Sequence, residues 1–370
     1  MKHIACLLSA ALLTAAAAAA DWPVFRGDAA QTGVAADPLP DKLAVRWQFK
    51  TAGDANSASV ESTAAIAGGV AFVGAFDDHL YALDLATGQM KWKLKTGAIK
   101  APVGVAGGAV FAGNIDGLLY CVDAATGKER WRYNAEAEVT SGINFTADGV
   151  LFGTQGETLY CVSRADGRLR WKFDVSGGPV MGTPAVAGGK TFAAGCDSTL
   201  HVIDAATGKE LAGVPLEGQV GASVAVRGDR LVVGTMTEQV VAVDLKKPEV
   251  AWTFHAAKRK QPFFASAALT DKLAITGSRD KRVYALDRAT GNEVWSFAAD
   301  GKVDSSPVVA GARVYVASND GNLYVLDLAT GREVQRVKLD GPISASPAVA
   351  GGCLVIGTER GTVYCLGVGK

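Results

Sequence analysis

Apolar residues in this chain come in short runs separated by turn-forming residues, and the whole arrangement returns about every forty residues. One copy has apolar runs at residues 305–310, 314–317, 323–327 and 333–337, with glycine-containing turns between them. Short runs that alternate with Gly and Asp-Gly turns are typical of β-hairpins. After residue 20 no segment keeps a 3.6-residue apolar period, so the pattern predicts an all-β chain nearly without helices.

The repeat carries the motif Ala-x-Asp-x-x-Thr-Gly-x-x-x-Trp, which occupies residues 82–92 and returns in full at residues 285–295. Residues 121–131 change only its first position, and looser copies begin at residues 161, 202, 242 and 325. A fixed period indicates stacked units, and four short antiparallel strands in forty residues are typical of a propeller blade. Helical repeats of similar period need an amphipathic helix, which this repeat lacks.

An eighth copy begins at Ser344, but the chain ends before its fourth strand. Residues 43–49 include Trp47 and match the fourth strand at residues 129–133, so they are the candidate for the missing strand. Pairing residues 43–50 with the strand around Tyr364 would close the ring and cover an exposed edge. The sequence thus predicts an eight-bladed β-propeller of four-stranded antiparallel blades over residues 43–370, preceded by an N-terminal extension at residues 21–42.

Six tryptophans recur at one position of the fourth strands, where a large aromatic ring most simply packs across the gap between blades. Ala212 and Gln335 take this position in blades four and seven, which predicts weaker contacts there. The tryptophans and the motif glycines are therefore interpreted as structural docking residues: Trp47, Trp92, Trp131, Trp171, Trp252, Trp295, Gly88, Gly127, Gly167, Gly208, Gly291 and Gly331.

Residues 1–20 have the basic start, the short apolar stretch and the Ala-x-Ala ending of a secretory signal peptide. We expect cleavage before Asp21, and no later segment is long and apolar enough to span a bilayer. Cys6 has no cleavage site in front of it, so a lipid anchor is not expected. These features predict a periplasmic or secreted protein, and we expect a monomer.

The chain has 37 basic and 37 acidic residues, and this balanced overall charge does not favour nucleic acid as a partner. Five cysteines follow the signal peptide. Cys121, Cys161 and Cys365 all occupy the first motif position, which should lie about 10 Å apart in adjacent sheets. A disulfide needs Cα atoms within roughly 4.4–6.8 Å, so no structural disulfide is predicted.

The motif resembles the tryptophan-docking repeat of quinoprotein (pyrroloquinoline quinone, PQQ) dehydrogenases over residues 43–370. PQQ-like propellers that bind no quinone share it, including the propeller lipoprotein of the outer-membrane β-barrel assembly machine. The opening residues 22–27 also resemble the start of secreted PQQ-like repeat proteins. The assembly-machine resemblance implies a docking platform for other envelope proteins.

The dehydrogenase resemblance would imply PQQ, calcium, an acidic catalytic residue and a pair of adjacent cysteines. The sequence has no Cys-Cys pair, no C-x-x-C-H haem motif and no long inserts. His79, His201 and His255 fall in different blades, and Asp77 with Asp78 forms an ordinary turn pair. We therefore expect no catalytic, cofactor-binding or metal residues. A reduced dehydrogenase with PQQ and calcium at the channel mouth is the alternative hypothesis.

Basic residues concentrate at blade six, in two segments that should lie on the same face of the propeller. The candidate site comprises Lys258, Arg259, Lys260, Phe263 and Phe264 in the link before blade six, and Arg279, Asp280, Lys281 and Arg282 in its second-to-third hairpin. It would bind an anionic ligand or an acidic envelope or secreted partner, with the phenylalanines as anchors. The alternative is a solvated loop whose phenylalanines point into the core.

Hydroxyl residues precede several first strands and would surround the axial opening: Ser62, Thr63, Ser223, Ser266, Ser305, Ser306, Ser344 and Ser346. Small residues are also what a crowded central channel admits, so this pattern alone assigns no function. Together the observations predict an exported, non-catalytic scaffold or binding protein, and the assembly-machine resemblance implies a role in cell-envelope protein assembly.

Overall fold

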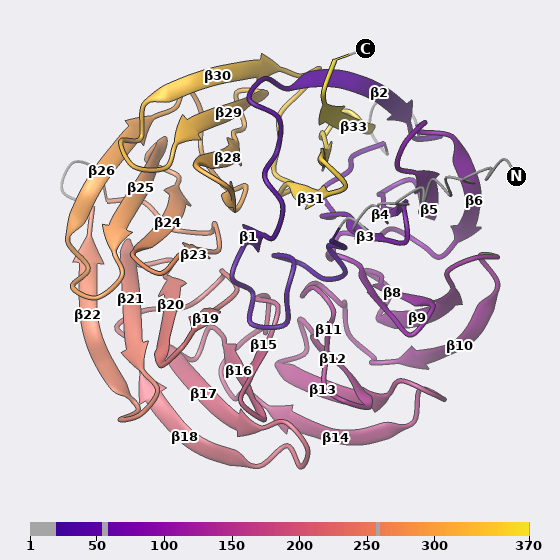
Figure 1. Cartoon of the computed structure of the whole chain (residues 1–370). Helices are drawn as coiled ribbons and strands as arrows, with labels where there is room; N and C mark the ends of the chain where they lie inside the picture. Colours follow the sequence, from indigo (N-terminus) through magenta and orange to yellow (C-terminus); the bar gives the residue numbers. More distant parts are fainter. Residues whose placement is uncertain (1–19, 54–57, 257–259, 370) are drawn as a thin grey trace, which may run out of the picture.

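The computed structural model describes residues 20–53, 58–256 and 260–369 of the 370-residue chain. Within these residues eight blades of four strands each stand around a central axis, a short additional strand extends the sheet of blade seven, and no helix occurs (Figure 1). The prediction of an all-β, eight-bladed propeller is confirmed. No described segment forms a helix of the length and apolarity that crossing a bilayer requires.

Each blade is a meander whose strands pair antiparallel in order from the axis to the rim. The first strands are β3 (Ala65–Ala67), β7 (Gly104–Ala106), β11 (Asn144–Phe145), β15 (Ala185–Ala187), β19 (Ala225–Arg227), β23 (Ala268–Leu269), β27 (Val308–Ala310) and β31 (Ala348–Ala350). The second strands are β4 (Val70–Gly74), β8 (Ala109–Gly113), β12 (Gly149–Gly153), β16 (Lys190–Ala194), β20 (Arg230–Gly234), β24 (Leu273–Ser278), β28 (Arg313–Ala317) and β32 (Cys353–Gly357).

The third strands are β5 (His79–Asp84), β9 (Leu118–Asp123), β13 (Thr158–Ser163), β17 (Thr199–Asp204), β21 (Gln239–Asp244), β25 (Arg282–Asp287), β29 (Asn322–Asp327) and β33 (Thr362–Gly367). The outer strands of blades one to seven are β6 (Met90–Lys95), β10 (Glu129–Asn134), β14 (Leu169–Asp174), β18 (Glu210–Pro215), β22 (Glu249–His255), β26 (Glu293–Ala298) and β30 (Glu333–Lys338). The inner strands are almost wholly buried, whereas the outer strands alternate between exposed and part-buried residues. The core therefore lies between neighbouring blades.

The outer strand of blade eight comes from the other end of the chain. β2 (Ala44–Lys50) pairs antiparallel with β33, with Trp47 opposite Cys365 and Gln48 opposite Tyr364. This is the pairing that the incomplete eighth repeat predicts, and it joins the two ends of the described chain in one sheet.

A tryptophan packs against the motif glycine of the next blade at six of the eight blade contacts. At the first, a Cβ added to Gly88 would lie 2.6 Å from the Trp47 ring, and the Trp47 indole donates a hydrogen bond to the Leu85 carbonyl at 2.8 Å. Gly88 has a φ of +75°, which glycine adopts without strain. The same contact recurs in the pairs Trp92–Gly127, Trp131–Gly167, Trp171–Gly208, Trp252–Gly291 and Trp295–Gly331.

The two remaining contacts differ from each other. Ala212 of blade four faces a blade whose third-to-fourth turn, residues 245–248, contains no glycine. Gln335 of blade seven instead accepts a hydrogen bond from the Leu43 backbone N–H at 2.9 Å and donates one to its carbonyl at 2.7 Å. The loss of tryptophan at blade seven is thus compensated by two hydrogen bonds to the residue before β2.

Residues 21–35, which we call the plug, cross the central opening and include the short strand β1 (Val34–Ala35) (Figure 1). β1 runs parallel to β27, and other plug residues contact the first strands of further blades. The plug carbonyls that accept first-strand N–H groups at 2.7–2.9 Å are Trp22 from Ile66, Pro23 from Val105, Ala29 from Val186, Ala30 from Val226, Thr32 from Leu269 and Gly33 from Val309. The extension at residues 21–42 therefore contains a segment that closes one end of the channel.

Candidate functional site

The central channel is a cup that opens on the face opposite the plug. Its cavity of about 220 Å³ is lined mainly by the residues just before the first strands, and the plug residue Phe25 forms part of its floor. The cup is lined by small polar side chains, with charged groups at its mouth. Its position on the axis places it next to all eight blades.

Six hydroxyl groups form a hydrogen-bonded ring in the wall of this cup. Each oxygen accepts a hydrogen bond from the backbone N–H of the equivalent residue one blade earlier, at 2.8–3.1 Å. The members are Thr63, Thr183, Ser223, Ser266, Ser306 and Ser346. None of the six hydroxyls donates a hydrogen bond to another described residue, so each keeps its hydrogen available for donation. The ring is interrupted at blades two and three, where Pro102 and Gly142 stand.

The sequence pattern identified five of these six hydroxyls. Ser62 bonds the Ala101 carbonyl at 2.8 Å, and the Ser305 and Ser344 hydroxyls have no hydrogen-bond partner among the described residues. Thr183 was missed, although it precedes Pro184 as Ser306 precedes Pro307. The Ser/Thr-Pro dipeptide was the signal that could have found it.

Arg26 of the plug is a buried cation that sequence analysis did not anticipate. Its side chain is 1% exposed, its guanidinium donates to the Pro307 carbonyl, and its centre lies 5.9 Å from the Phe25 ring. Its Nε and Nη1 have no partner among the residues that the structure describes. Burial lowers the pKa of Arg26 to about 9, partly offset by the charge of Asp28.

At the mouth of the cup, Arg279 and Phe264 of the candidate blade-six site come together. The Arg279 guanidinium lies 4.1 Å from the centre of the Phe264 ring and makes two hydrogen bonds to Asp304, at 2.9 and 3.1 Å. Phe264 is half-buried and lies over Gly221, where a Cβ would come within 2.8 Å of its ring. Phe264 and Asp304 both line the cavity.

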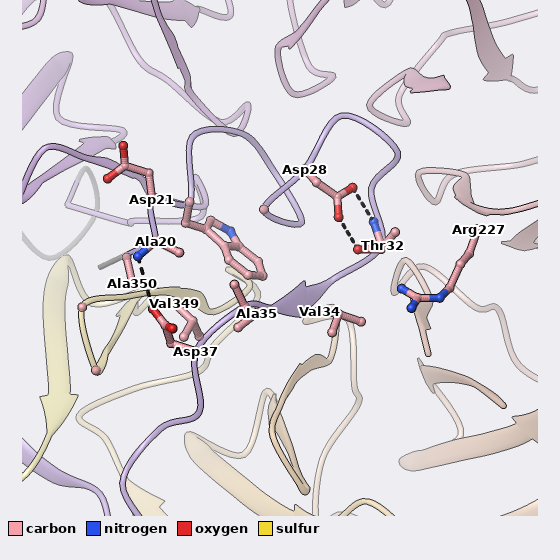
Figure 2. Close-up of a pocket in the computed structure, with 15 residues that line it drawn as sticks. Ala20, Asp21, Asp28, Thr32, Val34, Ala35, Asp37, Arg227, Val349 and Ala350 are labelled. Carbon is pink, nitrogen blue, oxygen red and sulfur yellow. Dashed lines mark hydrogen bonds between the residues drawn. The ribbon is translucent and has the colours of Figure 1, made fainter. Parts of the chain in front are cut away.

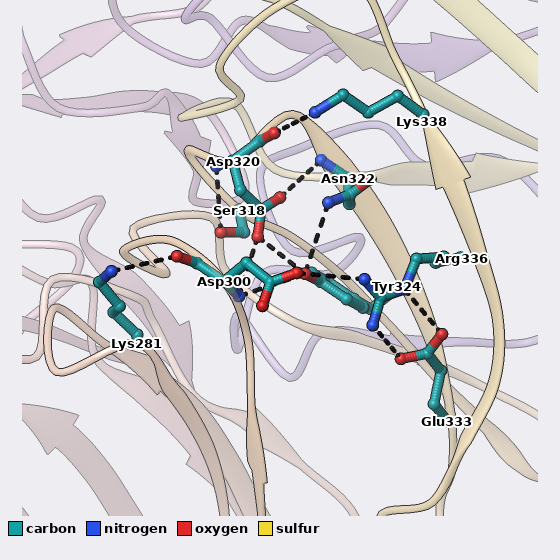
Figure 3. Close-up of polar contacts among 9 residues, drawn as sticks. All are labelled: Lys281, Asp300, Ser318, Asp320, Asn322, Tyr324, Glu333, Arg336 and Lys338. Carbon is teal, nitrogen blue, oxygen red and sulfur yellow. Dashed lines mark hydrogen bonds and ion pairs between the residues drawn. The ribbon is translucent and has the colours of Figure 1, made fainter.

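The other candidate residues point elsewhere. Arg282 donates to the Ser296 hydroxyl at 2.7 Å on the outer strand, and Asp280 is buried, accepting the Tyr284 hydroxyl at 2.5 Å. Lys281 reaches the Asp300 carbonyl at 3.1 Å, toward the polar network of blade seven (Figure 3). The hairpin thus presents Arg279 to the channel and directs its other charges away from it.

Phe263 and Phe264 have different environments. Phe263 is fully buried and packs 5.8 Å from the Tyr284 ring, which matches the core alternative for that residue. Lys260 is exposed. Lys258 and Arg259 lie outside the described residues, as does the predicted signal peptide apart from Ala20.

The network beside Lys281 joins blades six and seven around a buried tyrosine–aspartate pair (Figure 3). The Tyr324 hydroxyl donates to Asp320 at 2.7 Å, and Asp300 binds Arg336 at 3.1 Å. Burial and the hydrogen bond to Asp320 raise the pKa of Tyr324 to about 12. The equivalent tyrosines Tyr81 and Tyr284 make the same bond, so the network is a blade-to-blade contact rather than a reactive group.

The plug has a second pocket of about 330 Å³ on its outer side, lined in part by Asp28, Thr32, Asp37 and Arg227 (Figure 2). Asp28 accepts hydrogen bonds from the Thr32 N–H at 3.0 Å and from its hydroxyl, and Asp37 accepts the Ala20 N–H at 3.2 Å. Asp21, the third carboxylate that lines the pocket, accepts the Gly68 N–H at 3.0 Å. All three carboxylates thus already hold the plug and the residues beside it in place.

No group of three potential metal ligands comes together in the described part of the chain. His201 replaces the buried tyrosine of blade four and lies 2.7 Å from both Asp197 and Glu210, bridging two strands. Asp77 accepts the Tyr81 hydroxyl. These carboxylates serve blade structure.

The five cysteines of the described chain are unpaired. The sequence offered no partner for Cys353, but Cys353 and Cys365 are neighbours within blade eight. The hydrogen bond from Cys365 and the Arg46 guanidinium, 2.8 Å from the Cys353 sulfur, lower the pKa of Cys353 to about 6. Both thiols are almost fully buried.

Eight four-stranded blades, tryptophan–glycine docking and an axial cup define a PQQ-like β-propeller. The chain belongs to the family whose model is described as "Outer membrane protein assembly factor BamB", which matches residues 24–115, 77–152, 115–211, 196–269 and 250–334. A comparison with curated protein sequences found no match.

Solved structures share this fold at low sequence identity. BamB from Moraxella catarrhalis superimposes with a TM-score of 0.75 and 18% identity, over 88% of this chain and 98% of that one. The quinohemoprotein alcohol dehydrogenase from Comamonas testosteroni gives 0.80 and 14%, over 95% and 81%. The computationally designed Ika8 protein gives 0.75 and 19%, over 86% and 98%. At such identities the likeness concerns the fold alone.

Proposed function

We propose that this protein is an exported, non-catalytic scaffold of the cell envelope that holds an acidic partner or anionic ligand at the mouth of its channel. The observation that carries the proposal is the Phe264–Arg279–Asp304 group at the cavity edge, in which Asp304 takes two of the five N–H donors of Arg279 and leaves three for a partner. Arginine and aromatic side chains are enriched among the residues that dominate binding energy at interfaces. The family description, which names an outer membrane assembly factor, and the predicted signal peptide support the location and the role.

The dehydrogenase alternative requires residues to hold PQQ and calcium. Calcium takes six to eight oxygen ligands, several of them carboxylates. The cavity carboxylates are Glu61 and Asp304, and each already faces a cation, Lys100 at 4.0 Å and Arg279 at 2.9 Å. These residues do not fit a calcium–quinone site, which argues for binding rather than redox chemistry.

The proposal is tested by comparing Phe264→Ala with Phe263→Ala. Phe264→Ala removes the support of Arg279 at the mouth, so capture of partners from envelope extracts should fall about tenfold while the melting temperature stays near that of the wild type. Phe263→Ala should lower the melting temperature, because truncating a buried phenylalanine costs about 3–5 kcal/mol. Arg279→Glu with Lys260→Glu should also abolish capture.

Unchanged capture by the Phe264→Ala and Arg279→Glu variants would contradict the proposed site. In parallel, the purified protein is incubated with PQQ and calcium and assayed for a bound chromophore and for dye reduction by alcohols or sugars. Measurable turnover would establish the dehydrogenase alternative instead.

A further inference from the structure

The outer strands of blades one, two and three carry cations at the same positions. One row lies just before the docking tryptophans and contains Lys91, Arg130 and Arg170, and a second lies just after them and contains Lys93, Arg132 and Lys172. Lys95 extends the second row along β6. All seven side chains are exposed, and we call them the basic belt.

Blade architecture does not require these charges. The matching positions of blades four, five and six hold Leu211, Ala251 and Val294 before the docking position, and Gly213, Thr253 and Ser296 after it. The strands β18, β22 and β26 contain no lysine or arginine at all. The outer strands of the remaining two blades, β30 and β2, carry two cations each, so the positive charge of the rim is concentrated away from blades four to six although the net charge of the chain is zero.

Part of this positive charge is uncompensated. The belt arginines are paired, Arg130 with Asp123 at 2.7 Å, for example. By contrast, Lys93, Lys95 and Lys172 form no ion pair or side-chain hydrogen bond with any residue of the described chain. Three free ammonium groups, spread over two blades and joined by paired arginines, attract anions.

The direction of the belt indicates the kind of partner. A peptide that added to the sheet would follow one outer strand, whereas the belt crosses three, and lysines along an edge strand disfavour such pairing. Each blade is turned by about an eighth of a circle from the next, as in any ring of eight blades. A flat bilayer would therefore meet one blade squarely, while a flexible chain can follow the convex rim across all three.

We propose that the basic belt binds a linear anionic polysaccharide, a surface and a partner separate from the channel mouth. Recognition rests on charge along a curved path, so the affinity should decrease steeply as salt rises.

The test uses heparin and polygalacturonate as sulfated and carboxylated probes. Lys93→Glu, Lys95→Glu and Lys172→Glu together should weaken binding of both by about tenfold or more at low salt. The matched control changes three exposed lysines of blades four to six to glutamate: Lys209, Lys247 and Lys272. It alters the net charge by the same amount and should change binding less than about twofold. Melting temperatures of both variants should stay near that of the wild type, and partner capture at the channel mouth should be unchanged.

Equal weakening in the two triple variants would overturn the proposal, because it would reflect net charge alone. Absence of binding to both polysaccharides would overturn it as well. If vesicles containing phosphatidylglycerol bind through Lys93, Lys95 and Lys172 and the polysaccharides do not, the belt is a lipid-binding surface and the proposal is wrong.

Discussion

The tryptophan and the glycine of the docking contact are two halves of one interaction, and the chain retains or loses them together. Blade four lacks the tryptophan, and the blade that follows it lacks the glycine. At the six tryptophan–glycine contacts the indole ring occupies the space that a Cβ on the glycine would need, 2.7 Å away in the case of Gly127 and Trp92. Glycine is therefore required here both for its backbone conformation and for the room that it leaves.

These two requirements can be separated in one blade. Gly127→Ala should destabilise the protein by about 2–5 kcal/mol, since a positive φ costs alanine about 1–2 kcal/mol and the clash with Trp92 about 1–3 kcal/mol more. Gly107→Ala is the control, because Gly107 has a φ of +57° and open space where its Cβ would go. Gly107→Ala should therefore lose only the ~1–2 kcal/mol that a positive φ costs alanine. Equal losses in urea denaturation would mean that the ring contact contributes nothing.

At the scale of the element, the turn between the third and outer strands is built from an aspartate and a threonine. In blade one, Asp84 accepts hydrogen bonds from the Thr87 hydroxyl at 2.9 Å and the Thr87 N–H at 3.0 Å. These bonds lower the pKa of Asp84 below its ordinary value of 3.8. The same turn forms at Asp123, Asp204, Asp287 and Asp327.

A lowered carboxylate pKa makes the fold sensitive to acid. Between the ordinary pKa of 3.8 and the lower pKa of the folded state, the unfolded chain binds more protons than the folded one. The contribution of these hydrogen bonds to stability is therefore fully present above this pH range and is lost as the pH falls through it. Asp84→Asn with Asp204→Asn and Asp287→Asn should lower stability at neutral pH and flatten its decline below about pH 4. Urea unfolding from pH 3 to pH 7 measures this, with Asp78→Asn, in another turn of blade one, as the control. An unchanged acid slope in the triple variant would exclude these turns as its cause.

The regular elements could be predicted because every blade packs in the same way, so the same types of residue recur at the same positions of each repeat. The docking tryptophans and the turn aspartates recur at fixed positions. Because the eighth repeat lacks an outer strand, the pairing of β2 with that repeat could be predicted as well. The plug could not be predicted in this way, since it binds the first strands through its own carbonyls, which any residue possesses. At blade six, the shared face of the inter-blade link and the hairpin predicts that Arg279 lies near Phe264, but the opposite directions of Arg279 and Arg282 depend on the alternation of side chains along β25 and its turn.

At the scale of the whole molecule, the N-terminal segment has two separate tasks. β2 completes blade eight, whereas the plug closes one end of the channel and contacts the first strands of six blades. The buried Arg26 lowers the net stabilisation that the plug contributes, because an incompletely paired charge in the interior costs free energy.

Truncations distinguish the two tasks. Removing residues 21–50 should leave the edge of β33 uncovered and cause aggregation. Removing residues 21–37 alone should leave a monomeric propeller with a lower melting temperature and a channel open at both ends. Size-exclusion chromatography with light scattering, together with thermal melting, compares the two. Aggregation of the shorter truncation would mean that the plug, too, is needed to keep the ring closed.

The pairing of β2 also sets the order in which the molecule can be assembled. Arg46 contacts Cys353, which is 307 residues further along the chain, and Trp47 lies opposite Cys365. β2 precedes every blade in the sequence but can find its partner only after blade eight is made, and blades one to seven can form beforehand from contacts that are each local in sequence. Closure of the circle is then a single late step, because the first and last blades must dock before β2 can pair with β33, so the slowest folding phase should report on Trp47 rather than on any other tryptophan.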